Sequence, residues 1–322
     1  MAATRGSRAI PVPELVTRAQ AGEARAVARL ISMVEDVSPL LREVSAALAP
    51  HTGKAHVIGI TGSPGVGKST STAALVTALR KDGIRVGVLA VDPSSPFSGG
   101  ALLGDRVRMQ DHATDPGVYI RSMASRGHLG GLAWAAPQAI RVLDAAGCEV
   151  ILVETVGVGQ SEIEIAGLAD TTLVLLAPGM GDGIQAAKAG ILEIGDIFVV
   201  NKADRDGAAT TRRELRSMIS LTERPEDSWS PPIVLTVASK GEGIDEVAQT
   251  ITDHFVYLHE SGELDKRRLV RVRREIEAIA LAEVQRKFGD LSGDSRLDAL
   301  AESVMAGKDD PFGAADVLID SL

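Results

Sequence analysis

A glycine-rich segment in the first quarter of the chain has the residue types and spacing of a phosphate site. Residues 62–70 fit the pattern G-x-x-x-x-G-K-[ST] and follow an apolar run at 57–60, a context in which a chance glycine-rich turn is rare. Glycines let the backbone curl so that its N–H groups point at phosphates, and a helix beginning near Ser69 adds the partial positive charge of its N-terminus. Lys68 would reach the β- and γ-phosphates, and the Ser69 hydroxyl would bind magnesium. The nucleotide-binding candidates are Gly62, Ser63, Pro64, Gly65, Val66, Gly67, Lys68, Ser69 and Thr70.

Charged residues that follow the next apolar run could complete the site. Asp92 comes directly after the run 86–91, and a carboxylate at the end of a strand beside a phosphate loop is placed to hold magnesium or its water. Asp105 is a second candidate metal ligand. Arg106 and Arg108 could offset the charge that develops on the γ-phosphate. A solvated surface charge is an equally good interpretation of each arginine.

Another apolar run ends in Glu154-Thr155-Val156-Gly157, the pattern D-x-x-G with glutamate in place of aspartate. Glu154 would hold a magnesium-bound water, and the Gly157 N–H would contact the γ-phosphate, so that loss of this phosphate frees the loop. Val158 stands where many nucleotide hydrolases have a water-orienting glutamine, and Gln160 or Glu162 could take over that task. We therefore expect slow hydrolysis that a partner or a second copy accelerates. The candidate catalytic residues are Lys68, Asp92, Arg108, Glu154 and Gly157, and the candidate metal ligands are Ser69, Asp92, Asp105 and Glu154.

A second motif predicts which base is bound. Residues 201–204 read Asn-Lys-Ala-Asp and follow the apolar run 197–200. The Asp204 carboxylate would accept hydrogen bonds from the N1–H and the 2-amino group of guanine, two donors that adenine lacks. After a later apolar run, the backbone N–H of Ala238 could contact the guanine O6. The predicted ligands are therefore GTP and GDP with Mg²⁺, and the predicted reaction is GTP hydrolysis. The candidates for base recognition are Asn201, Lys202, Asp204, Val237, Ala238 and Ser239.

The elements that must position these motifs alternate between strands and helices. Over residues 54–258, apolar β-branched runs are separated by helical patterns or glycine-rich loops, which predicts an α/β fold of the P-loop class with a mostly parallel, doubly wound sheet. Every motif follows the end of such a run, and ligands of these sheets bind at the carboxyl ends of the strands. The predicted strands are 57–60, 86–91, 118–121, 150–153, 172–176, 197–200 and 233–237.

Helical segments flank this α/β domain. Residues 1–53 have apolar positions at helical spacing, and Gly22 and Pro39 divide them into two or three helices. Residues 259–322 are expected to form a C-terminal helical arm. The basic stretch 266–274 could be a patch for an acidic partner or a solvated helix face, and we favour the solvated face because acidic residues follow it. Apolar residues of the same stretch fit a dimer seam equally well.

Composition narrows the class of protein. The chain has 322 residues and a formal net charge of −9, which argues against a nucleic-acid partner. Cys148 is the only cysteine, and a small buried side chain is a better interpretation of it than a catalytic thiol. No apolar run is long enough to span a membrane, and the N-terminus lacks the apolar core of a signal peptide. We expect a cytoplasmic protein that binds no membrane.

Longer runs of the sequence resemble the MeaB/ArgK family over nearly the whole chain. These runs are GSPGVGKST, VDPSSPFSGGALLGDRVRM, ETVGVGQSE, APGMGDGIQAAKAGILE, NKAD and ASKGEGI. Members of the family are GTPases that act as chaperones of adenosylcobalamin-dependent methylmalonyl-CoA mutase. The resemblance implies a G domain of the signal-recognition/MinD-like (SIMIBI) class, a homodimer formed through the C-terminal arm, and GTP-gated delivery of the cofactor to the mutase with ejection of damaged cobalamin.

The resemblance also implies a third switch loop at 178–191, with Asp182 and Lys188 as transmitters to the mutase. The residues by themselves indicate only a glycine-rich turn from a strand to a helix with a charged face. The Asp-x-His-x-x-Gly pattern of cobalamin-binding domains is missing, so we do not expect this chain to hold cobalamin itself.

Three other functions fit the motifs less well. GTPases that insert nickel usually carry His-rich tracts or Cys motifs, whereas this chain has six His and one Cys. A signal-recognition GTPase would need a Met-rich or basic RNA-binding domain. A nucleotide-dependent kinase agrees with an older family label, arginine/ornithine transport kinase, but the guanine motif argues against ATP as the substrate and the lack of membrane spans argues against transport.

Overall fold

The computed structural model describes residues 10–36, 38–93, 112, 114–125, 135–155, 161–179, 190–221, 225, 227–288 and 295–320. The chain divides into two compact units, Met1–Arg271 and Val272–Leu322. The first unit contains the motifs that the sequence singles out.

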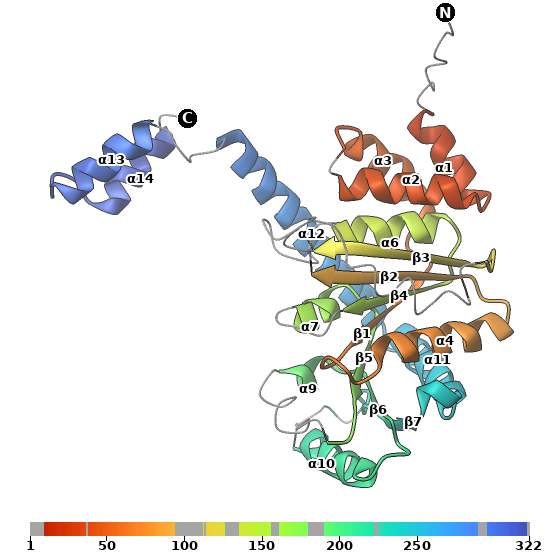
Figure 1. Cartoon of the computed structure of the whole chain (residues 1–322). Helices are drawn as coiled ribbons and strands as arrows, with labels where there is room; N and C mark the ends of the chain where they lie inside the picture. Colours follow the sequence, from red (N-terminus) through yellow and green to blue (C-terminus); the bar gives the residue numbers. More distant parts are fainter. Residues whose placement is uncertain are drawn as a thin grey trace, which may run out of the picture. The chain divides into compact units, whose positions relative to one another are not determined.

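A seven-stranded sheet forms the centre of the first unit (Figure 1). Its strand order is β3-β2-β4-β1-β5-β6-β7, and every neighbouring pair is parallel. All seven predicted strands are confirmed, as is the α/β fold class. Because all strands run the same way, their carboxyl ends lie at one edge of the sheet. The bounds are β1 His56–Thr61, β2 Val86–Pro93, β3 Val118–Ser125, β4 Val150–Thr155, β5 Thr171–Leu176, β6 Ile197–Asn201 and β7 Ile233–Thr236.

Neighbouring residues of one strand belong to two different cores. Val57 of β1 and Ile151 of β4 pack in the cluster that contains α6, whereas Ile58 and Leu152 pack with α4 and α11. Successive side chains of a strand point to opposite faces, so helices cover both faces of the sheet. Every residue of β1, β4, β5 and β6 is buried, which is why these strands are continuous apolar runs in the sequence. The covering helices are α4 Lys68–Lys81, α6 Ala135–Ala145, α10 Ala208–Ser220 and α11 Ile244–Glu260.

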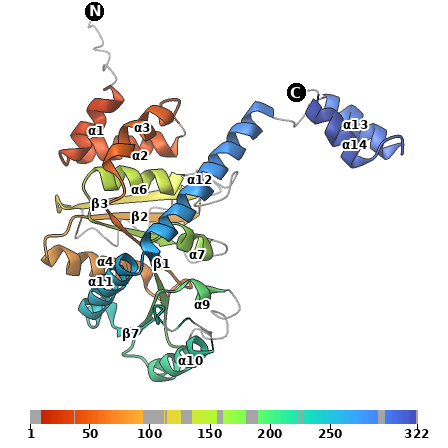
Figure 2. The same cartoon turned by 180° about the vertical axis from the view of Figure 1, so that it is seen from behind.

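Three helices precede the sheet in the described residues, in agreement with the predicted helical extension. Leu30 and Val44 from these helices are fully buried in the core that α6 shares, and Figures 1 and 2 show the three helices beside α6. The Tyr119 hydroxyl of β3 donates to the Gly22 carbonyl at 3.0 Å. The extension is therefore packed on the α/β domain. Its helices are α1 Val12–Gln20, α2 Ala24–Glu35 and α3 Leu41–Leu48.

The C-terminal helices begin after a turn that follows α11. Gly262, with φ 69°, adopts the left-handed conformation in this turn, which glycine tolerates without strain. The 26-residue helix α12, Glu263–Phe288, then runs from the first unit into the second. The second unit also contains α13, Ser295–Met305, and α14, Pro311–Asp320. No helix in the described parts of the chain is both long enough and apolar enough to cross a membrane.

Three arginines of the basic stretch bind carboxylates, so the prediction of a solvated helix face is wrong for them. Arg268 donates to the two oxygens of Asp170 at 3.2 and 2.9 Å, and Arg271 donates to one of the same oxygens. Arg267 donates to Asp196 at 3.0 and 2.9 Å. Burial would raise the pKa of the fully buried Asp170, but its hydrogen bonds and the arginine charges outweigh burial and lower it.

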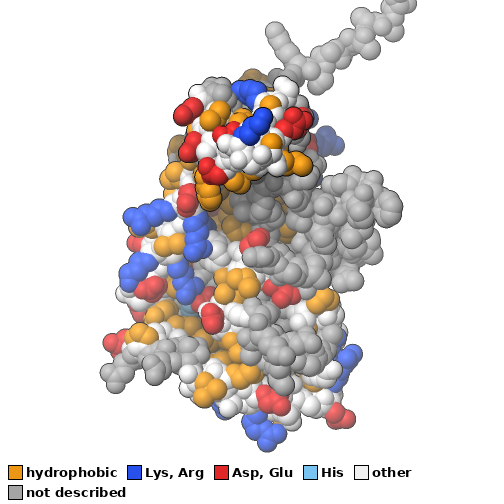
Figure 3. Space-filling view, turned by 90° about the vertical axis from the view of Figure 1, so that its left-hand side faces the viewer, with side chains coloured by type: hydrophobic (Ala, Val, Ile, Leu, Met, Phe, Trp, Pro, Cys, Tyr) orange, Lys and Arg blue, Asp and Glu red, His pale blue; other side chains and the backbone are white. Residues whose placement is uncertain are grey.

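These ion pairs attach the beginning of α12 to the residues that precede β5 and β6. That edge of the sheet carries the amino ends of the strands, so it lies opposite the edge that carries the motifs. On the face shown in Figure 3, several Lys and Arg side chains gather at the left of the view.

Candidate functional site

The phosphate loop connects β1 to α4 and requires glycine at two positions. Gly62 has φ 137°, and a Cβ atom there would lie 2.2 Å from the carbonyl oxygen of Leu175. Gly67 has φ 102°, and its Cβ atom would lie 2.4 Å from the Asn201 amide nitrogen. The backbone therefore passes β5 and the guanine motif more closely than any side chain would allow. This loop has the strand-to-helix context that the sequence predicted.

Lys68 is the first residue of α4, and its side chain folds back over the loop. The ammonium donates to the carbonyl of Gly62 at 2.6 Å and to that of Ser63 at 3.1 Å, and the residue is 7% exposed. A charged amine held by carbonyls at the mouth of the loop is positioned to meet a phosphate oxygen.

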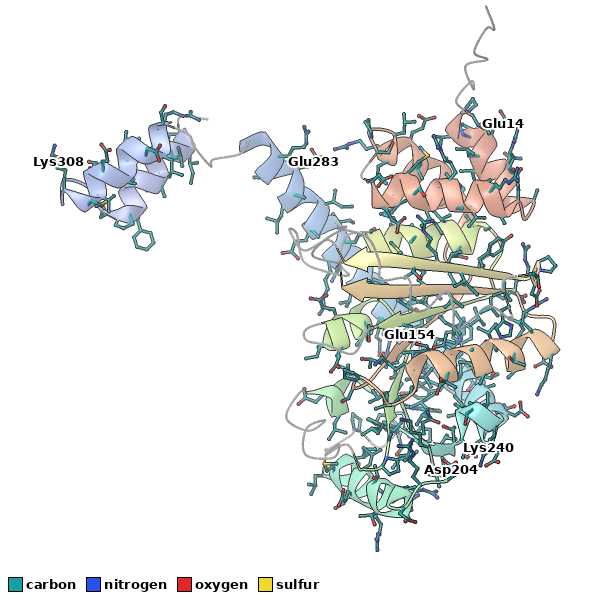
Figure 4. All side chains as sticks on the ribbon, in the orientation of Figure 1. Glu14, Glu154, Asp204, Lys240, Glu283 and Lys308 are labelled. Atoms are coloured by element: carbon teal, nitrogen blue, oxygen red, sulfur yellow. The ribbon has the colours of Figure 1, made fainter. Side chains whose placement is uncertain are left out.

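Glu154, at the carboxyl end of β4, faces the beginning of α4 (Figure 4). Its two oxygens accept hydrogen bonds from the Ser69 hydroxyl at 2.6 Å and from the Thr72 hydroxyl at 2.8 Å. The structure thus brings together two of the predicted metal ligands, Ser69 and Glu154. A hydroxyl and a carboxylate are the oxygen donors that Mg²⁺ prefers, so these residues fit the ion. Sequence analysis missed Thr72, because it lies outside the phosphate-loop pattern.

Glu162 lies within electrostatic range of the phosphate-loop lysine. It belongs to the short helix α7, Ser161–Glu164, and is partly buried. Burial raises the pKa of its carboxyl group, and the charge of Lys68 opposes this rise. Of the two residues proposed to orient the attacking water, the structure describes Glu162, whereas Gln160 lies outside the described residues, and the role stays a prediction for both.

Asn201, the last residue of β6, connects the guanine motif to the phosphate loop. Its amide NH₂ donates to the Val66 carbonyl at 2.8 Å. Its amide oxygen accepts from the Thr236 hydroxyl at 3.2 Å and from the Ala238 N–H at 3.1 Å. The residue is only 3% exposed, and its side chain acts as a brace that connects the ends of β6 and β7 to the phosphate loop.

The Ala238 hydrogen bond affects the prediction for guanine O6. Its N–H donates to Asn201 in this structure, so contact with a base would require that bond to open or the next amide, of Ser239, to take its place. Contact of Val237, Ala238 or Ser239 with the base stays a prediction.

Asp204 and Lys240 lie side by side (Figure 4). Their charged groups are 3.4 Å apart, and the side chains are 45% and 55% exposed. Lys202 has φ 59°, in the left-handed region that few residues other than glycine adopt, and its ammonium donates to the Gly65 carbonyl at 2.5 Å. The guanine motif therefore contacts the phosphate loop at two points while its carboxylate remains accessible.

Several predicted site residues cannot be placed. Asp105, Arg108 and Gly157 lie outside the described residues, as does most of the predicted switch loop with Asp182 and Lys188. The backbone of Asp92 is described and pairs with that of Ala124, whereas its side chain is not described. The predicted roles of these residues stay predictions.

Cys148 is buried, as predicted. It is 3% exposed and packs in the core that contains α6, and burial raises the pKa of its thiol to about 12. A thiol with such a pKa is not a nucleophile at neutral pH, so this residue has a packing role.

Known proteins that are similar to this chain are GTPases, as the phosphate loop and the guanine motif predict. Residues 27–291 match the family model of the methylmalonyl Co-A mutase-associated GTPase MeaB. A protein of Pyrococcus horikoshii that carries the name of a GTPase is 47% identical over 314 residues, which are 97% of this chain and 98% of the relative. The GTPase ArgK of Escherichia coli is 38% identical over 82% of this chain and 81% of its own length. The mitochondrial methylmalonic aciduria type A homolog of Mus musculus is 34% identical over 96% of this chain and 79% of its own length.

A solved structure has a similar fold. The crystal structure of a LAO/AO transport system kinase superposes with a TM-score of 0.74 at 28% identity, and the match covers 97% of this chain and 99% of that one. The family model spans most of this chain, including the phosphate loop, Glu154 and the guanine motif. This chain is therefore a P-loop GTPase and belongs to the MeaB/ArgK family.

Proposed function

We propose that this GTPase is a chaperone of adenosylcobalamin-dependent methylmalonyl-CoA mutase and that its nucleotide state controls the loading and protection of that enzyme. One observation carries the proposal: the match to the family of mutase-associated GTPases, which spans residues 27–291. The hydrogen bond from Asn201 to the phosphate loop supports the proposed control by nucleotide state. It connects the predicted base site with the phosphate site, so that both can respond to one bound nucleotide.

The residues of the site suit GTP hydrolysis. The N–H groups of the loop and the Lys68 ammonium would stabilise negative charge on the β- and γ-phosphates. Ser69 and Glu154 would hold Mg²⁺, with Asp92 and Asp105 as further candidates, and the ion would neutralise charge on the phosphate oxygens. Arg108 would offset charge on the γ-phosphate.

Recognition of guanine would require Asp204 to exchange one partner for another. Its ion pair with Lys240 is long and exposed, and such pairs contribute little to stability. The carboxylate is therefore free to accept the N1–H and the 2-amino group of guanine. An adenine ring would leave it without donors, which disfavours ATP.

Loss of the γ-phosphate would act through the loops that follow Glu154 and β5. Gly157 would lose its contact with the phosphate, and the loop 178–191, with Asp182 and Lys188, would transmit the change to the mutase. Val158 cannot orient a water molecule, so Glu162 or Gln160 would do so. We expect the mutase to accelerate the hydrolysis, which single-turnover assays with and without mutase would measure.

Homodimer formation is proposed to use the C-terminal helices. An apolar face along α12 is exposed to solvent, and a second copy of the same helix would cover it in a symmetric interface. Light scattering should detect a dimer, and Ile276→Glu should weaken it without changing GDP affinity. The exposed residues of this face are Leu269, Val272, Ile276 and Ile279.

The chaperone function is tested by affinity capture of methylmalonyl-CoA mutase. The protein should capture the mutase to different extents when loaded with GDP and with a non-hydrolysable GTP analogue, and the Asp204→Ala variant should lose this difference. If the mutase were captured equally in both nucleotide states, or in neither, the chaperone proposal would be wrong. The assignment of the chain as a GTPase would still stand. A kinase, as the name of the similar solved structure suggests, would instead transfer label from the γ-phosphate of GTP to an acceptor rather than release it as free phosphate.

A further inference from the structure

Both oxygens of the Glu154 carboxylate are held by hydroxyl groups from one helix. The Ser69 hydroxyl donates to Oε1 at 2.6 Å, and the Thr72 hydroxyl donates to Oε2 at 2.8 Å. Ser69 belongs to the phosphate loop, and a magnesium role was predicted for it. Thr72 belongs to no motif, yet it is 0% exposed and Glu154 is only 4% exposed.

The position of Thr72 on α4 explains this contact. Ser69 and Thr72 are three residues apart, so they lie on the same face of the helix, and that face is turned toward the end of β4. The Thr72 hydroxyl also lies 3.0 Å from the Lys68 carbonyl. Its single proton can serve only one of these two acceptors at a time, and a carboxylate accepts a stronger hydrogen bond than a neutral carbonyl does.

We propose that Thr72 is a positioning residue for the magnesium site. By holding Oε2, its hydroxyl prevents the carboxylate from rotating and keeps Oε1 directed at Ser69, where the metal or its water would be held. A β-branched side chain on a helix has few rotamers, so threonine presents its hydroxyl more rigidly than serine would. This inference rests on the proposed Mg²⁺-dependent binding of guanine nucleotide.

The same helix offers a matched control. The Thr77 hydroxyl also lies 3.0 Å from the carbonyl four residues earlier, that of Ala73, but Thr77 is exposed and its other partner is His112 at 3.2 Å. Thr72→Val and Thr77→Val therefore remove the same kind of hydroxyl contact within the helix. Only Thr72→Val also removes a donor to Glu154.

The experiment measures binding of a fluorescent GDP analogue as Mg²⁺ is titrated, in the full chain. A charge-assisted hydrogen bond to a buried carboxylate is lost, so Thr72→Val should raise the Mg²⁺ concentration at half-saturation by about tenfold. Binding of the analogue in EDTA should stay within about twofold of the unsubstituted protein. Thr77→Val should change neither quantity. In Thr72→Ser, which keeps a hydroxyl group, the Mg²⁺ concentration at half-saturation should be close to that of the unsubstituted protein. If Thr72→Val does not fold, the comparison of Thr72→Ala with Thr72→Ser tests the same hydroxyl.

A second arm tests whether Thr72 acts through Glu154. In a Glu154→Gln background, Thr72→Val should have a much smaller effect on Mg²⁺ binding, because the two changes share one interaction. Full additivity would overturn the proposal, and so would an unchanged Mg²⁺ requirement in Thr72→Val and Thr72→Ala. If the unsubstituted protein bound the GDP analogue equally well with and without Mg²⁺, the metal part of the proposed function would fail together with this inference.

Discussion

The amide of Asn201 donates to the carbonyl of Val66 at 2.8 Å and so joins the guanine motif to the phosphate loop across 135 positions of sequence. Gly67 makes this contact possible, because a side chain there would overlap the amide nitrogen. Contacts within the protein thus hold the two halves of the nucleotide site at a fixed spacing, which lowers the cost of ordering them for binding.

Replacement of this brace should weaken nucleotide binding because it loosens the connection between the two halves of the site. Asn201→Ala removes one donor and one acceptor from a buried position, and we expect it to destabilise the fold by about 2–4 kcal/mol and to reduce GDP affinity by at least about tenfold. Calorimetric titration and chemical unfolding measure the two effects. Lys202→Met, which removes an exposed contact with the same loop, is the control and should have a smaller effect on stability. Unchanged GDP affinity in Asn201→Ala would contradict a bracing role.

Base selection should follow the chemistry of one carboxylate. Asp204→Asn replaces an acceptor with a donor, which opposes the guanine 2-amino group but suits the carbonyl at the same position of xanthine. GDP affinity should fall by about a hundredfold or more, and xanthosine diphosphate should become the better ligand. Competition binding with both diphosphates and ADP checks this order. Lys240→Met serves as the control and should retain the preference for guanine over xanthine.

The beginning of α12 should depend on its buried ion pairs. Arg271→Met leaves the fully buried Asp170 with fewer cationic partners, and removal of one partner from a buried pair typically costs about 3–5 kcal/mol. Urea unfolding would measure the loss. Lys266→Met, which removes an exposed pair from the same helix, should leave stability unchanged. Equal unfolding midpoints for the two variants would mean that the arginine contacts are not structural.

Stability should fall in mild acid because two buried histidines resist protonation. The ring nitrogens of His56 and His254 lie 2.7 and 2.8 Å from the Thr171 hydroxyl, and burial lowers their pKa values from 6.5 to about 3 and about 4. Nearby Asp170 and Asp196 oppose this lowering, and Arg267 and Arg268 add to it.

In the window between these folded values and 6.5, the unfolded chain binds protons that the folded chain does not. Stability is therefore complete above about pH 6.5 and falls as the pH decreases, by about 2 kcal/mol per histidine at about pH 5. His254→Gln should reduce the slope of unfolding free energy against pH, whereas His51→Gln, at an exposed position, should leave the slope unchanged. An identical slope in His254→Gln and the unsubstituted protein would show that the buried ring does not cause the effect.

The sequence by itself determined the fold class, the nucleotide motifs and the family. Strands buried on both faces must be continuous apolar runs, so β1, β4, β5 and β6 could be predicted from the sequence. The phosphate loop and the guanine motif depend on short stretches of chain whose chemistry is local. The burial of Cys148 could be predicted in the same way, because the residue lies beside an apolar run in the sequence.

Only the tertiary structure decided the contacts between segments far apart in the chain. Thr72 donates a hydrogen bond to Glu154, which lies on β4, far along the chain. The prediction of solvated arginines on α12 was wrong because their partners, Asp170 and Asp196, lie about 70 to 100 positions earlier in the sequence, next to strands of the sheet. Whether a charged side chain is buried and paired depends on which distant segments the fold brings together. The sequence shows only which residues are neighbours along the chain, so it does not predict such pairs.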